Sequence, residues 1–224
     1  MSQYRKDILA NNEYYHIYNR SIAKYIIFNN AQEYSRMLEL INILLFKNFN
    51  YQYSQFKKFS QNNQKEIIDK LKIQNDTLVD IICYCVMPTH FHLLLKQNVD
   101  HGITKYIGKL SNSYSKYFNT IHQRSGPLWA SRFKNIRVED DKQLLHLTRY
   151  IHLNPASAGL VNNAQDWKYS TYGEFLGKSQ NKICKFKDII DMDYIEYKKF
   201  VDDRKNYQQQ LSQIKNLVID NYTG

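Results

Sequence analysis

The sequence lacks long apolar runs, and none approaches the length that a membrane-spanning helix requires. Its first residues, MSQYRKDILANN, also lack the apolar segment of a secretory signal. We therefore expect a cytoplasmic protein with no membrane partner. Cysteine is scarce as well, and the three cysteines, Cys83, Cys85 and Cys184, are too few for a disulfide framework. Cys83 and Cys85 would share one face of an extended strand, so we interpret all three as reduced core residues.

No glycine-rich phosphate loop, internal repeat or long linker interrupts the 224 residues. Length and pattern together favour one α+β domain over residues 1–177, followed by a C-terminal helical extension over residues 178–224. Within the domain, residues 47–76 are rich in Asn and Gln and show a helical pattern only at residues 67–71. We interpret residues 47–76 as a polar insertion or mobile excursion and assign it no role.

Positive charge and tyrosine are present in excess. The formal net charge is +10 at pH 7, and the chain has 19 Tyr and 11 Phe. Cations for phosphates and flat rings for bases are the two ingredients of single-stranded nucleic-acid binding. A protein from an AT-rich genome is also rich in Lys, Tyr and Asn, so composition alone leaves both interpretations open.

Hydrophobic periodicity predicts the elements of the domain. In chain order these are a strand over residues 14–20, a helix over 31–46, a hairpin over 78–97 and a helix over 102–122. Another helix is expected from Asp140 or Asp141 to about Asn154, because Pro155 discourages its continuation. A loop and a short helix should follow, and apolar positions between residues 189 and 201 suggest helices in the extension.

The hairpin carries two histidines, His90 and His92, at the start of its second strand. Successive side chains of a strand point to opposite faces, so both imidazoles point to the same face. Their Cα atoms are separated by about 6.6 Å, a gap that two inclined rings can close onto one divalent ion. Two hydrogen-bonded polar residues on a half-exposed strand would have the same spacing, and the spacing does not separate these interpretations.

Basic residues occur in two further places that could meet phosphate. Lys105 and Lys109 line one face of the predicted helix over residues 102–122, where a lysine face is either solvated or bound to phosphate. Arg132, Lys134 and Arg137 follow in a stretch that also contains aromatic residues, a mixture typical of nucleic-acid binding but not specific to it.

Four blocks of the sequence, in order, carry a resemblance to a known family. They read CYCVMPTHFHLLL, GPLWASRFK, RYIHLNPASAGL and DWKYSTYGEFLG. This set resembles the IS200-type single-tyrosine transposases, and within them the REP-associated tyrosine transposase branch. These proteins belong to the HUH nuclease group, named for a histidine, hydrophobic residue, histidine motif that His90, Phe91 and His92 match. The resemblance covers residues 14–177, so residues 178–224 have less support from it.

The resemblance implies a ferredoxin-like antiparallel sheet with helices packed on one face and the HUH strand in its centre. It implies that Tyr150 is the nucleophile and that His90, His92 and Asn154 bind a metal ion. Another branch of the family has Gln at the position of Asn154, and either amide oxygen can bind an ion. Many relatives have Asn where this sequence has Thr89. A site without a closed thiolate or imidazole cage favours Mg²⁺ or Mn²⁺ over structural Zn²⁺.

The implied activity is cleavage and rejoining of single-stranded or hairpin DNA through a 5′-phosphotyrosine, by a monomer or possible homodimer. Lys105, Lys109, Arg132, Lys134 and Arg137 are then candidates for binding the DNA strand. Two other functions fit the same fold: a non-catalytic DNA-binding protein acting on repeat or hairpin DNA, and a metal-dependent hydrolase that uses water instead of Tyr150.

Overall fold

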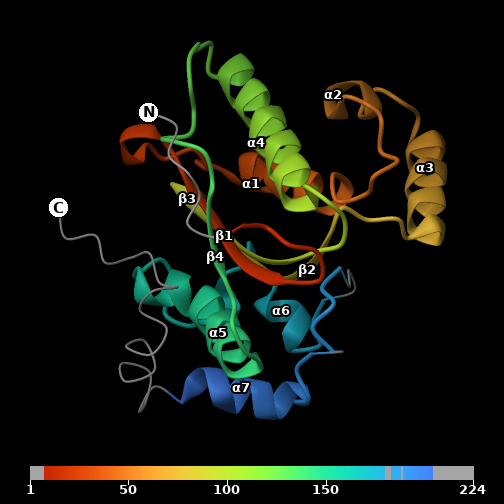
Figure 1. The fold of residues 1–224 in the computed structure, drawn as a ribbon. Helices are drawn as coiled ribbons and strands as arrows, with labels where there is room; N and C mark the ends of the chain where they lie inside the picture. Colours follow the sequence, from red (N-terminus) through yellow and green to blue (C-terminus); the bar gives the residue numbers. More distant parts are fainter. Residues whose placement is uncertain (1–7, 180–182, 188, 204–224) are drawn as a thin grey trace.

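The computed structural model describes residues 8–179, 183–187 and 189–203. Its centre is a sheet of four strands, β1 (Tyr14–Arg20), β2 (Val79–Met87), β3 (His90–Gln97) and β4 (Lys134–Arg137). The strand order is β2-β3-β1-β4, and every neighbouring pair is antiparallel. Helix α1 (Ala31–Ile43) connects β1 to β2, and α4 (Gly102–Ile121) connects β3 to β4. The predicted ferredoxin-like α+β topology is therefore confirmed, with the histidine-bearing strand in the interior of the sheet (Figure 1).

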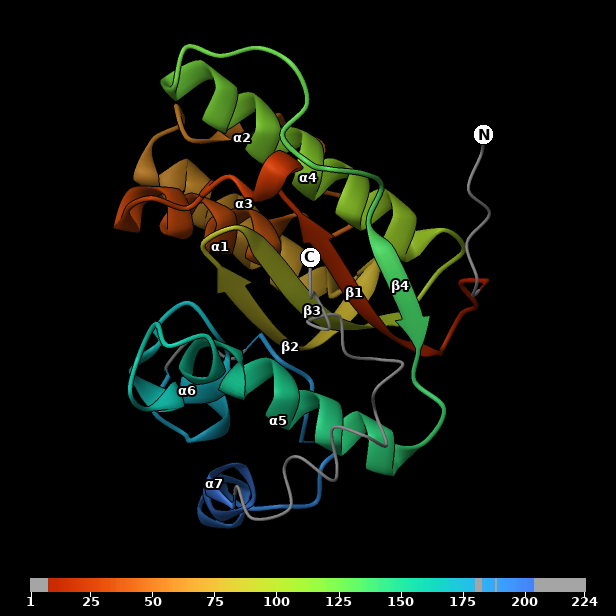
Figure 2. The same ribbon diagram turned by 90° about the vertical axis from the view of Figure 1, so that its left-hand side faces the viewer.

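Helices cover both faces of this sheet, which corrects the expectation that they pack on one face (Figure 2). Strand residues such as Ile17, Phe91 and Leu93 belong to a buried cluster with residues of α1 and α4. Residues of opposite orientation, such as Cys85 and Leu94, belong to a second cluster with α5 (Asp141–Ser157). Because both orientations of the strands are apolar, each face needs its own helical cover. We call the face that α5 covers the α5 face.

The chain between α1 and β2 is more ordered than the sequence indicated. It contains α2 (Tyr53–Phe56) and α3 (Gln61–Gln74). Helix α3 is therefore much longer than the helical pattern that the sequence shows at residues 67–71. Ser60 caps α3 by accepting a hydrogen bond from the Asn63 backbone. Phe49, Phe56 and Leu71 are buried in the first cluster and attach this segment to the domain. Leu71 is the only buried residue of α3, which is why its sequence shows no clear apolar period.

Helix α5 begins as expected and ends later than expected. The Asp140 side chain caps it by accepting a hydrogen bond from the Gln143 backbone at 2.7 Å. The helix then continues through Pro155 to Ser157, so the expected end near Asn154 was wrong. Proline lacks one donor but has a helical φ, and here it lies in the last turn of a helix that is buried from His146 through Pro155.

The remaining chain forms short elements. These are the 3-10 turns η1 (Ile22–Lys24) and η2 (Ala164–Asp166), then α6 (Tyr172–Phe175) and α7 (Tyr194–Asp202). Helix α7 packs beneath α5, where Tyr197 and Val201 are buried in the second cluster (Figure 2). Within residues 178–224, which we predict to be a helical extension, α7 is the helix in the described part; residues 180–182, 188 and 204–224 lie outside the described residues.

Candidate active site

His90 and His92 both point to the α5 face, and their ring centroids are 4.9 Å apart. His92 is fully buried, whereas His90 is half-buried at the end of the β2–β3 turn. Nδ1 of His90 lies 2.9 Å from the Thr89 hydroxyl, and Nδ1 of His92 lies 3.0 Å from Nε2 of His16. In both ligand candidates the Nδ1 atom is therefore engaged, which leaves Nε2 as the nitrogen for any ion.

Burial keeps the His92 imidazole neutral. It is the main cause that holds the pKa of His92 well below its ordinary value, and His90, His16 and Arg20 lower this pKa further. A neutral imidazole is the form that binds a metal ion. His92 therefore meets the first chemical requirement of a ligand throughout the neutral pH range.

Helix α5 places Tyr150 over these histidines. The Tyr150 ring meets the His92 ring edge to face, with centroids 5.8 Å apart, and lies 6.2 Å from His16. Asn154 follows one helical turn later, on the same side of α5 as Tyr150. Both are almost entirely buried, at 3% and 6% exposure, because α5 packs directly against β2 and β3.

Unsatisfied polar atoms indicate that this set of residues fits a metal ion. Nε2 of His92 and the side-chain nitrogen of Asn154 are buried without hydrogen-bond partners in the described part of the chain. Such atoms are costly unless something binds them. A half-turn of the Asn154 amide exchanges its nitrogen for its oxygen, which is a suitable ligand for a hard cation. Among residues 8–179, 183–187 and 189–203, no group of three His, Cys, Asp or Glu residues offers an alternative metal site.

The predicted DNA-binding residues are dispersed. Lys134 stands opposite Tyr18 in the β1–β4 pair, with its ammonium 5.9 Å from the Tyr18 ring, and that ring lies 6.4 Å from His92. Arg132 is exposed just before β4. Arg137 forms a 2.7 Å ion pair with Glu13.

Lys105 and Lys109 are exposed on α4, which covers the opposite face of the sheet from α5. The structure therefore brings Lys134 to the edge of the histidine site and places the two α4 lysines across the sheet from it.

The sequence did not single out His16 and Tyr18, although both lie beside His92. Their alternation within YYHIYNR puts them on one strand face, and that face turns out to be the α5 face. Local sequence could not give this result, because it depends on β1 pairing with β3 rather than with another strand.

Two other histidines on α5, His146 and His152, have partners outside the candidate site. Both ring nitrogens of His152 are engaged, by the Tyr197 hydroxyl at 2.8 Å and the Thr171 hydroxyl at 3.0 Å. Nδ1 of His146 lies 3.3 Å from an Arg149 guanidinium nitrogen. Neither ring is paired with another histidine ring in the way that His90 and His92 are, 4.9 Å apart.

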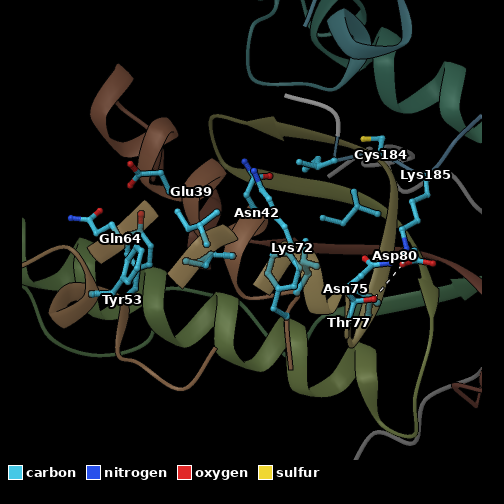
Figure 3. Close-up of a pocket in the computed structure, with 18 of the residues that line it drawn as sticks. Glu39, Asn42, Tyr53, Gln64, Lys72, Asn75, Thr77, Asp80, Cys184 and Lys185 are labelled. Carbon is cyan, nitrogen blue, oxygen red and sulfur yellow. Dashed lines mark hydrogen bonds and ion pairs between the residues drawn. The ribbon is translucent and has the colours of Figure 1, made fainter. Parts of the chain in front are cut away.

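A pocket of about 630 Å³ lies elsewhere, between α1, the α2–α3 segment and the outer edge of β2 (Figure 3). Its charged groups are largely paired, Lys57 with Glu39 at 3.0 Å and Lys185 with Asp80 at 2.8 Å. It contains none of the residues predicted for catalysis, metal binding or DNA binding. The candidate site is thus a buried interface between α5 and the sheet, not this pocket.

No helix in the described ranges has the length and apolar character needed to span a bilayer. This agrees with the absence of long apolar runs in the sequence.

Comparisons with known proteins agree with the fold and the motifs. A protein named as a REP-associated tyrosine transposase of Haemophilus influenzae is 29% identical over 105 residues, which cover 42% of this chain and 58% of that protein. The REP-associated tyrosine transposase of Escherichia coli K12 is 22% identical over 121 residues, covering 54% of this chain and 71% of that protein. The chain thus spans little more than half of the Haemophilus protein.

Among solved structures, a REP-associated tyrosine transposase bound to a REP hairpin matches 86% of this chain and 95% of its own. The TM-score is 0.52 at 17% sequence identity, so this likeness concerns the fold. The model of the family described as "Transposase IS200 like" matches residues 38–154, just over half of the chain, and this range includes His90, His92, Tyr150 and Asn154. The chain therefore belongs to the IS200-like transposase family.

Proposed function

We propose that this protein is a metal-dependent transposase that cleaves and rejoins single-stranded DNA through a 5′-phosphotyrosine on Tyr150. The observation that carries the proposal is the position of Tyr150 on α5, with its ring 5.8 Å from that of the buried, neutral His92. Membership of the IS200-like family and the names of the two relatives support it.

His90, His92 and Asn154 are the residues that we assign to a Mg²⁺ or Mn²⁺ ion. Two neutral imidazoles and one amide oxygen do not neutralise a divalent cation, which when bound would stabilise the extra charge of a phosphodiester under attack. Because Thr89 and His16 contact the two Nδ1 atoms, Nε2 is the atom of each imidazole that we assign to the ion.

In the proposed reaction, the Tyr150 oxygen forms a bond to the scissile phosphorus and the bond from phosphorus to the 3′-oxygen breaks. The proton of the tyrosine hydroxyl ends on the released 3′-OH, so no water or nucleotide is consumed. Attack of a 3′-OH on the phosphotyrosine reverses these steps and rejoins a strand. An isolated tyrosine, with a pKa of about 10, is a weak nucleophile at neutral pH. Lys134, at the edge of the site, is positioned to attract the DNA phosphate.

The burial of Tyr150 sets a requirement for this reaction. Because Tyr150 is 3% exposed, the groups around its ring must rearrange before a DNA phosphate can reach it. Half-buried His90, next to the β2–β3 turn, marks the edge of the site from which a strand would enter.

We propose single-stranded or hairpin DNA as the substrate. The solved relative that shares this fold is bound to a REP hairpin, and the chain carries a formal net charge of +10. Lys134 and Arg132 are candidates for contacts near the scissile phosphate. Lys105 and Lys109, across the sheet, are candidates for a more distant part of the same DNA, and the ion pair with Glu13 makes Arg137 a weaker candidate.

The proposal is tested by incubating the protein and Mn²⁺ with single-stranded oligonucleotides that cover the repeats flanking its gene. We expect a protein–DNA adduct on a denaturing gel for wild type, and none for Tyr150→Phe or His92→Ala. Tyr172→Phe is a matched control, because Tyr172 is buried in the same cluster and its hydroxyl has no hydrogen-bond partner in the described part of the chain.

Tyr172→Phe should form the adduct at the wild-type level. DNA binding without any adduct would favour a non-catalytic DNA-binding protein. Cleavage that survives Tyr150→Phe would favour a hydrolase that uses water.

A further inference from the structure

His16 is a fully buried histidine that the proposed reaction does not use directly. It lies on β1, and the antiparallel register pairs it with Leu94 while Tyr18 is paired with His92. His16 and His92 are therefore diagonal neighbours on the same face of the sheet, close enough for long or aromatic side chains to touch. His16 also precedes residues 38–154, the range that matches the family model.

The contact between the two rings is both stacked and hydrogen-bonded. Their centroids are 5.2 Å apart with planes inclined by 22°, and Nε2 of His16 lies 3.0 Å from Nδ1 of His92. Neither ring is exposed to solvent, at 0% for each. Between two neutral imidazoles, one nitrogen must donate and the other must accept.

The direction of this hydrogen bond decides what His92 can bind. If His92 donates from Nδ1, its Nε2 has a free lone pair, and Nε2 is the atom that is buried without a hydrogen-bond partner. If His16 donates, the proton of His92 is on Nε2 and the lone pair needed by an ion is absent. The partner of Nδ1 therefore selects the tautomer, as acceptors beside metal-bound histidines commonly do.

We propose that His16 is a positioning residue, which accepts a hydrogen bond from Nδ1 of His92 and so fixes its tautomer and ring orientation for a divalent cation. This inference rests on the proposed metal site. His16 does not bind the ion itself through Nε2, because that atom faces His92. The Thr89 hydroxyl has the corresponding place at Nδ1 of His90, so each of the two proposed histidine ligands has a partner at Nδ1.

The first test measures Mn²⁺ affinity of the full chain without DNA, by the electron paramagnetic resonance signal of free Mn²⁺. His16→Phe keeps an aromatic ring but removes the acceptor, and we expect it to lower affinity by about 10- to 100-fold. His16→Gln can supply an amide acceptor near the position of Nε2 and should bind within a few-fold of wild type. The matched control is His152→Phe, another fully buried histidine, which contacts the rings of Tyr172, Phe175 and Tyr197 and should also stay within a few-fold.

Equal affinity of His16→Phe and wild type would overturn the role of His16. Failure of wild type itself to bind Mn²⁺ would instead overturn the proposed metal site. If wild type does not bind Mn²⁺, or if His16→Phe does not fold, the ¹⁵N chemical shifts of the histidine rings still test the role of His16. The ¹⁵N chemical shifts of metal-free wild type should show the His92 proton on Nδ1, and a proton on Nε2 would overturn the inference.

Discussion

His152 shows what burial does to a single imidazole in this protein. It is fully enclosed, and burial lowers its pKa from the ordinary 6.5 to about 3. The unfolded chain takes up a proton near pH 6.5, whereas the folded chain does so only near pH 3. The unfolded state therefore binds more protons over this interval, and the free energy of unfolding falls as the pH is lowered through it.

We expect this residue to reduce the free energy of unfolding by roughly 2 kcal/mol between about pH 7 and about pH 5. Urea unfolding at the two pH values measures the loss. In His152→Phe the free energy of unfolding should depend less on pH. Some decrease toward low pH should persist, because the pKa of His92 is also lowered. The same pH dependence in wild type and His152→Phe would contradict the assignment.

At the residue scale, the sequence predicts which residues share a face of one helix or strand. It does not predict which residues of different elements lie close together. Tyr150 and Asn154 share a side of α5 because they are four residues apart, and His90 and His92 share a strand face because they are two apart. His16 lies 76 positions from His92, and only the pairing of β1 with β3 brings their rings into contact.

At the element scale, α5 carries both Tyr150 and Asn154, so the stability of its first turn can be tested apart from the chemistry. We expect Asp140→Ala to lower the free energy of unfolding by about 1 kcal/mol, because the Gln143 backbone loses its acceptor. The matched control is Asp141→Ala, an exposed acid in the same turn that favours the helix dipole but is not the cap, and about 0.5 kcal/mol is expected there. Equal losses in the two variants, measured by urea unfolding, would show that the cap does not stabilise the helix.

The elements that could be predicted are those with one clear apolar face. Strand β1 was predicted at its observed bounds from alternation, and α4 to within one residue from its apolar stripe. Helix α3 was mostly missed because only Leu71 is buried, so capping by Ser60 rather than periodicity marks where it begins. The end of α5 was missed because packing of its last turns outweighs the local preference of Pro155.

At the scale of the whole molecule, the sheet separates the proposed chemistry from a basic surface. Tyr150 and the histidines lie on the α5 face, and Lys105 and Lys109 are exposed on α4 over the other face (Figure 2). Helix α4 contains no acidic residue that would neutralise these lysines. A DNA that contacts both surfaces must extend around the edge of the sheet.

Replacing both Lys105 and Lys109 with Ala should weaken DNA binding and reduce the slope of log affinity against log salt by about 2. Adduct formation at saturating DNA should remain at the wild-type rate, because neither lysine is near Tyr150. The double variant Lys65→Ala and Lys70→Ala on α3 removes the same two charges and is the control. If both double variants weaken binding equally in a salt titration, net charge and not the α4 surface is responsible.

The central claim is that Tyr150, among 19 tyrosines, attacks DNA. Mass spectrometry of peptides from the purified protein–DNA adduct tests it most directly, because the modified residue is read from the fragment masses. The account predicts a 5′-linked nucleotide on Tyr150 alone, in the peptide that also contains Asn154. A nucleotide on any other tyrosine would contradict it.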